Sequence, residues 1–126
     1  MLELKNNISK FIVILILVSI IDMIWIQIFA KKKYEIMIKD IQGEPMKLNV
    51  KYAVACYIII ALLVLLLINK NFNYSELFLA GLFTYGIFDL TNASVFNKWD
   101  MMFGLADMIW GGILFTSTGY IFNKIT

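Results

Sequence analysis

Histidine and arginine are absent from this 126-residue chain, and cysteine and proline occur once each, as Cys56 and Pro45. Without histidine there is no imidazole to bind a metal ion or to titrate near neutral pH. A single cysteine cannot form an internal disulfide, and zinc sites built from cysteine and histidine are excluded. We therefore expect no metal site and no cofactor.

Charge is also scarce, since only 16% of the residues are charged whereas 61% are apolar. The mean hydropathy is +0.81. A soluble domain is typically about 45–50% apolar. These values indicate an integral membrane protein of one domain, residues 1–126, in a cell or viral membrane. No basic face with interleaved aromatic residues lies outside the apolar runs, so no nucleic-acid partner is expected.

Four apolar runs are long enough to cross a bilayer, for which about 20 residues suffice. They cover residues 11–30, 50–68, 77–96 and 101–122. The expected fold is an all-α integral membrane protein with four transmembrane helices.

A short amphipathic segment separates the first two runs. Residues 34–42 place apolar side chains on one face and charged side chains on the other. This pattern predicts a helix that lies in the plane of the membrane interface. The apolar face consists of Tyr34, Met37, Ile38 and Ile41.

Three aspartates lie inside the apolar runs, namely Asp22, Asp89 and Asp107. A carboxylate at membrane depth is costly and marks a functional site by default. Consecutive spans alternate in direction, and a helix rises 1.5 Å per residue. All three carboxylates are therefore expected about 10–12 Å inside the same membrane face. We interpret them as candidate proton-binding or ion-binding residues, and the catalytic residues, if any, remain unassigned.

Polar, aromatic and small residues accompany the aspartates. Small and hydrogen-bonding residues on one stripe favour close helix packing or a polar interior. The glycines expected at helix contacts are Gly81, Gly104 and Gly111. The expected supporting residues are Ser19, Trp25, Tyr85, Thr91, Asn92 and Trp110.

The tetrapeptide Asp-Met-Ile-Trp occurs twice, at residues 22–25 and 107–110, on helices expected to be antiparallel. The match is either a product of biased composition or a shared local chemistry. In the second case a buried acid lies one turn from an indole whose N–H needs an acceptor.

The remaining patterns concern lipid contact and orientation. Residues 58–68 contain no polar side chain, so the run 50–68 is interpreted as a lipid-facing helix. Seven of the eleven lysines lie in residues 31–51 and 97–100. The positive-inside rule then places the carboxylate-bearing face toward the cytoplasm. Aromatic residues near the span ends are interpreted as interfacial anchors: Tyr52, Tyr57, Trp99 and Tyr120.

The chain resembles a family of small membrane proteins, domain of unknown function 2177. The resemblance covers nearly the whole chain and implies a four-helix membrane fold without implying an activity. Its most specific part is the block Tyr85 to Asn92, which contains Asp-Leu-Thr-Asn at residues 89–92. The other matching residues are Asp22, Trp25, Lys31, Tyr34, Asp107, Trp110 and Gly111.

Three functions fit these residues. The first is a proton- or cation-coupled transporter or channel, which would be a homo-oligomer because four helices make a thin pore wall. The second is a membrane-embedded hydrolase or transferase that uses two aspartates on lipid or a lipid-attached substrate. In the third, the chain is a structural or accessory protein, for example of a virion. Whether the protein is an enzyme stays open, and its expected ligands are a proton, a cation or lipid.

Overall fold

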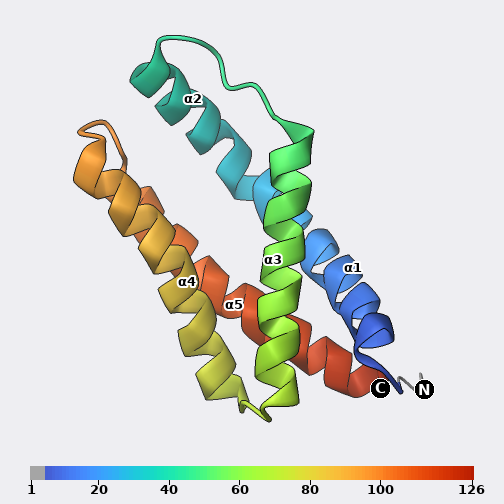
Figure 1. Cartoon of the computed structure of the whole chain (residues 1–126). Helices are drawn as coiled ribbons and strands as arrows, with labels where there is room; N and C mark the ends of the chain where they lie inside the picture. The colour runs from blue at the N-terminus through green and yellow to red at the C-terminus, as the bar shows by residue number, and fades with distance from the viewer. Residues whose placement is uncertain (1–4) are drawn as a thin grey trace.

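The computed structural model describes residues 5–126 (Figure 1). Within this range the chain is helical and contains no strand, which confirms the all-α fold. The ends of α3, α4 and α5 lie within three residues of the expected ones, whereas the first helix begins about one turn early and continues past residue 30. The elements are α1 (Asn7–Trp25), η1 (Ile26–Ala30), α2 (Lys31–Gln42), α3 (Val50–Asn69), α4 (Tyr74–Val95) and α5 (Met101–Ile125).

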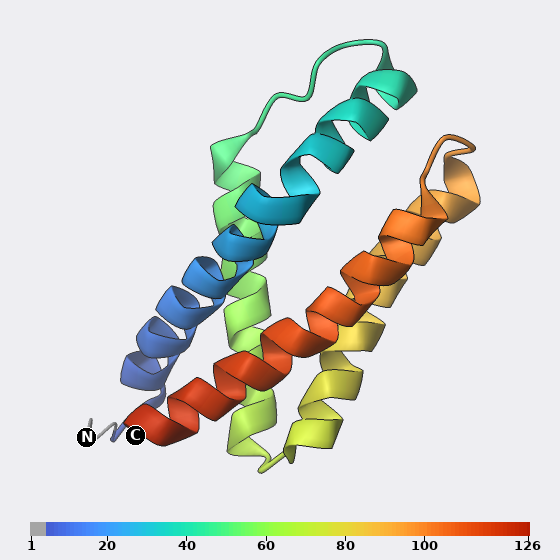
Figure 2. The same ribbon diagram turned by 180° about the vertical axis from the view of Figure 1, so that it is seen from behind.

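The first three elements form one unbroken helix of 36 residues, from Asn7 to Gln42. The sequence suggested a gap between two helices at Lys31 to Lys33, but lysine is a good helix former and the backbone continues. The helix ends at Gly43, whose φ of 77° lies in the left-handed region that glycine adopts readily. The π-helical segment η1 is a wider helical turn that continues α1 into α2 (Figure 2).

Helices α4 and α5 form an antiparallel hairpin, and the contact between them is the most extensive in the molecule (Figure 2). A capping box of Asn73 and Glu76 begins α4, and the Asp100 carboxylate caps α5. The two helices touch where Gly81 meets Gly111. A Cβ atom on Gly81 would lie 2.0 Å from the Gly111 carbonyl oxygen. Only glycine permits this approach.

Three helices are long and apolar enough to cross a membrane: Asn7–Gln42, Val50–Asn69 and Met101–Ile125. The hairpin partner α4 is not among them. The main core lies where α1, α3 and α5 meet. It contains Ile14, Val18, Ala61, Val64, Leu114 and Phe115. A second cluster lies where α2 meets the α4–α5 turn, and consists of Ala30, Met37, Trp99 and Phe103.

Candidate functional site

The three aspartates of the apolar runs lie inside the protein, on three different helices. Asp22 of α1, Asp89 of α4 and Asp107 of α5 have exposed fractions of 6%, 0% and 3%. All three carboxyl groups lie near the phenol of Tyr34 in α2. The fold therefore gathers the three acids in one region.

Asp22 is held by two neutral donors from other helices. The Tyr57 hydroxyl of α3 donates to Asp22 Oδ2, and the Trp110 indole of α5 donates to Oδ1 at 2.9 Å. Both oxygens of this carboxyl group are thus occupied. Hydrogen bonds to a carboxylate are shorter and stronger than bonds between neutral groups, so this pair of donors fixes its position.

Asp107 has a similar set of neighbours, but they bind it less tightly. The Tyr34 hydroxyl donates to Asp107 Oδ2 at 3.4 Å, a long hydrogen bond. The Trp25 indole also lies against this carboxyl group. Within residues 5–126, however, the Trp25 N–H has no partner with hydrogen-bond geometry. Asp107 therefore lies between a phenol and an indole without a firm bond to either.

The two Asp-Met-Ile-Trp copies interact reciprocally across α1 and α5. Asp22 is bonded by Trp110, and Asp107 lies against Trp25. The Trp25 and Trp110 rings stack between them, with centroids 5.2 Å apart and planes inclined by 7°. Each acid is thus associated with the indole of the opposite helix. An antiparallel pair of helices produces this exchange naturally, because equal spacing places each motif's acid beside the other motif's indole.

Asp89 is fully buried, and neither of its oxygens has a hydrogen-bond partner in the described part of the chain. Its polar neighbours are the Asp107 carboxyl group and the Trp99 indole. The two carboxyl groups are neighbours across the α4–α5 contact, where a Cβ atom on Gly104 would lie 3.4 Å from the Cβ of Asp89. A hydrogen bond between them would require a proton, because ionised carboxylates only accept.

The other residues singled out in the sequence lie at varying distances from the acids. The phenol of Tyr85 lies near the carboxyl groups of Asp22 and Asp107. Thr91 is exposed, because two residues along a helix place it on the far side from Asp89. Ser19 and Asn92 are half-buried, and within residues 5–126 neither forms a side-chain hydrogen bond to a carboxylate.

The three packing glycines are buried in the α4–α5 contact. A Cβ atom on Gly104 would lie 3.4 Å from the Cβ of Asp89, and one on Gly111 would lie 2.5 Å from the Tyr85 ring. Close packing at these positions holds α4 against α5, and so sets the distance between Asp89 and Asp107.

Two aromatic residues interpreted as interfacial anchors are instead part of the site. The Tyr57 hydroxyl donates to Asp22, although its helix α3 was interpreted as a lipid-facing packing helix. Trp99 is 8% exposed and packs against Tyr34 and Phe88. Position near the end of a span gave the wrong interpretation for both. The two remaining aromatic anchors, Tyr52 and Tyr120, are exposed.

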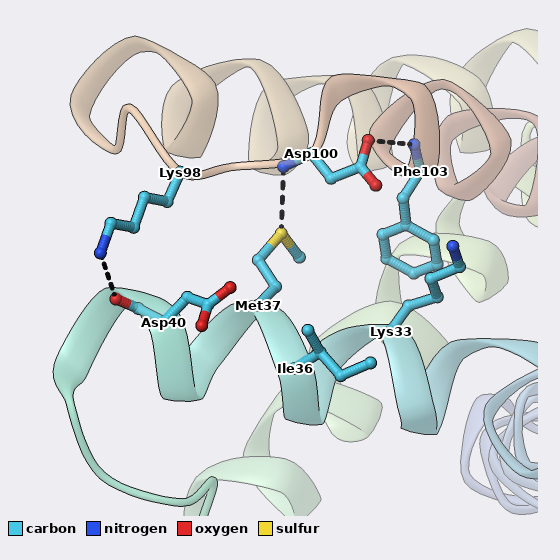
Figure 3. A pocket seen from close by; sticks show the side chains of 7 residues that line it. All are labelled: Lys33, Ile36, Met37, Asp40, Lys98, Asp100 and Phe103. Carbon is cyan, nitrogen blue, oxygen red and sulfur yellow. Dashed lines mark hydrogen bonds between the residues drawn. The ribbon is translucent and has the colours of Figure 1, made fainter.

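A cleft of about 190 Å³ opens beside this group, between α2 and the α4–α5 turn (Figure 3). Phe103 lines the cleft and also packs edge-on against Tyr34, with centroids 5.0 Å apart. The Lys98 ammonium group donates to the Asp40 carbonyl at 2.9 Å and bridges the two sides. The other lining residues are Lys33, Ile36, Met37 and Asp100.

The model of a family described as predicted membrane protein, domain of unknown function 2177, matches residues 7–122. The chain belongs to this family. Membership confirms the resemblance seen in the sequence and places the chain among predicted membrane proteins. The match includes all three aspartates and their tryptophans. No curated protein and no solved structure gives a significant match.

Proposed function

We propose that the facing carboxyl groups of Asp89 and Asp107 share a proton inside the membrane, and that this site serves a proton-coupled transporter or a proton channel. The observation that carries the proposal is the pair itself. Asp89 is fully buried with no hydrogen-bond donor among residues 5–126, and its acidic neighbour is Asp107. A proton between the two groups would satisfy both.

The surroundings of the pair favour a proton over a metal ion. Asp22 already accepts two hydrogen bonds, so it is not free to complete a coordination shell. In the described range, no three acidic or cysteine side chains lie close enough to hold a metal ion. Polar groups within membrane helices commonly belong to proton relays. The pair is therefore better suited to hold and release a proton than to bind a cation.

The membrane arrangement that fits this role has four spans, with α4 crossing alongside α5. The 36-residue helix would be about 54 Å long, whereas the hydrocarbon layer is about 30 Å thick. Its charged end, α2, therefore belongs in the interface rather than in the hydrocarbon. The lysine bias favours a cytoplasmic position for α2 and the α4–α5 turn. Large apolar side chains remain exposed on the helices, which suits contact with lipid and with further copies of the chain.

Proton flux into liposomes tests the function. Wild-type protein should acidify or alkalinise the lumen along an imposed pH gradient, and Asp89→Asn and Asp107→Asn should abolish the flux. Thr91→Ala, an exposed position on the same helix as Asp89, is the matched control and should conduct like wild type. The absence of flux from folded wild-type protein over a range of gradients would refute the channel. Counterflow with small solutes would then test a coupled transporter.

The same pair also suits a membrane-embedded hydrolase or transferase, because facing carboxyl groups can act as general acid and general base on one water. Lipid or a lipid-attached molecule would be the substrate. This reading predicts a chemical change in lipids incubated with wild-type protein and none with Asp89→Asn. In a structural or accessory protein, by contrast, both substitutions would leave function intact.

A further inference from the structure

Each of the three membrane aspartates has a tryptophan beside it, and the chain contains only three tryptophans. Trp110 donates to Asp22, Trp25 stacks on Trp110 beside Asp107, and Trp99 packs on Phe88 beside Asp89. The three indoles come from three different segments, namely α5, α1 and the α4–α5 turn. Local sequence therefore does not account for the pairing, which arises in the fold.

The three pairs differ in whether the indole N–H has a hydrogen-bond partner. The Trp110 N–H donates to Asp22 at 2.9 Å. The N–H groups of Trp25 and Trp99 are buried and have no partner among residues 5–126. A buried donor is normally satisfied, and an exception calls for an explanation. Both unsatisfied indoles lie beside the two acids that face each other.

We propose that Trp25 and Trp99 are positioning residues. Their indole N–H groups donate hydrogen bonds to the carboxylates that form when the proton leaves the Asp89–Asp107 pair. This inference rests on the proposed proton site. On release, one carboxyl O–H bond breaks and the proton goes to water. The two carboxylates then repel each other. Asp107 keeps the Tyr34 O–H and turns to the Trp25 N–H, and Asp89 turns to the Trp99 N–H.

The supply of donors matches this change. In the protonated pair, the two carboxyl groups form a hydrogen bond with each other, and the N–H groups of Trp25 and Trp99 have no acceptor. In the ionised pair, each carboxylate gains an indole, and Asp107 also keeps the Tyr34 hydroxyl. Both indoles are already neighbours of the acids, and both have an N–H without a partner among residues 5–126. The Trp25–Trp110 stack holds one of these indoles in place.

Other titratable groups lie around the pair on the neighbouring helices. Asp22 on α1, Tyr34 on α2 and Tyr85 on α4 lie near Asp107, whereas Tyr57 and Cys56 on α3 lie next to Asp22. Asp22 keeps its own donors, Tyr57 and Trp110, in both states. Within residues 5–126, the lysine side chains that form hydrogen bonds reach Asn69 and the Asp40 carbonyl, and neither Asp89 nor Asp107. The indoles and the Tyr34 phenol are therefore the donors at hand to stabilise the new charge.

The test is a pH titration of protein labelled with ¹⁵N at the indole nitrogens, in detergent micelles or nanodiscs. The spectrum contains three indole N–H signals, which single Trp→Phe variants assign. The signals of Trp25 and Trp99 should move downfield together with one midpoint as the pH rises, because both acquire charged acceptors. The Trp110 signal, already bonded to Asp22, should stay in place and serves as the internal control.

Variants separate this inference from simple packing. Asp89→Asn should abolish the pH dependence of the Trp99 signal while that signal remains dispersed, as in folded protein. Trp99→Phe should move the midpoint of the Trp25 signal to higher pH, because the ionised pair loses a donor. Unchanging Trp25 and Trp99 signals, or an equal shift of Trp110, would overturn the inference. Flux lost in Asp89→Asn with no indole shift would refute this role and leave the proton site standing.

Discussion

The close approach of α4 and α5 predicts that Gly81→Ala destabilises the protein more than Gly86→Ala, the substitution of the other glycine on α4. The new Cβ atom would lie 2.0 Å from the Gly111 carbonyl oxygen, 2.6 Å from the carbonyl carbon and 2.9 Å from the Phe115 ring. The helices would have to separate by about 1 Å to restore van der Waals distances. Overpacking costs about 1–3 kcal/mol, and this contact with rigid backbone lies at the upper end.

Gly86→Ala on the same helix is the matched control. There the nearest atom is the Met108 methyl at 3.0 Å, the movable end of a flexible side chain. Both substitutions gain about 1 kcal/mol of helix propensity. The net change should therefore be a loss of about 2 kcal/mol for Gly81→Ala and little loss for Gly86→Ala. Unfolding by denaturant in mixed micelles measures the difference, and equal stability of the two variants would refute the packing of α4 on α5.

Three further predictions concern individual contacts. Tyr57→Phe removes a donor from buried Asp22 and should cost about 1.5–3 kcal/mol in the same assay, whereas Tyr52→Phe, exposed on the same helix, should be neutral. Equal effects of the two would show that the phenol does not bond Asp22. Asn73→Ala breaks the capping box at the start of α4 and should cost about 1 kcal/mol, and an unchanged midpoint would contradict that cap. Lys98→Ala removes an exposed contact to the Asp40 carbonyl and should change stability by less than about 0.5 kcal/mol, so that a larger loss would point to a stronger bridge across the cleft.

Much of the architecture could be predicted from the sequence, because membrane helices require long apolar runs that are easily recognised. Apolar runs, bounded by lysines and by a few polar turn residues, predicted the last three helices with ends within about one turn of the observed ones. Glycines spaced along one face of α4 and α5 pointed to close packing, and Gly81 and Gly111 meet there. The continuous helix through Lys31 to Lys33 was not foreseen, since charge marks the edge of the hydrocarbon but does not stop a helix.

Partners across the site were harder to foresee than the acids themselves. Asp22, Asp89 and Asp107 stand out because carboxylates are rare in apolar runs. Tyr57 and Trp99 do not stand out, since an aromatic residue near the end of a span is normally an interfacial anchor. The Asp-Met-Ile-Trp repeat suggested an acid and an indole on one helix, whereas the pairing crosses between α1 and α5. Only the tertiary arrangement determines which indole meets which acid.

The most direct test of the central proposal is infrared spectroscopy of the carboxyl groups in membranes at neutral pH. A proton shared by Asp89 and Asp107 should give a carboxylic-acid C=O band that shifts in deuterated buffer. The band should disappear in Asp89→Asn and in Asp107→Asn, because the remaining carboxylate then has an amide donor beside it. It should persist in Asp22→Asn. A wild-type protein without this band, or a band that survives in Asp89→Asn and Asp107→Asn, would contradict the shared proton.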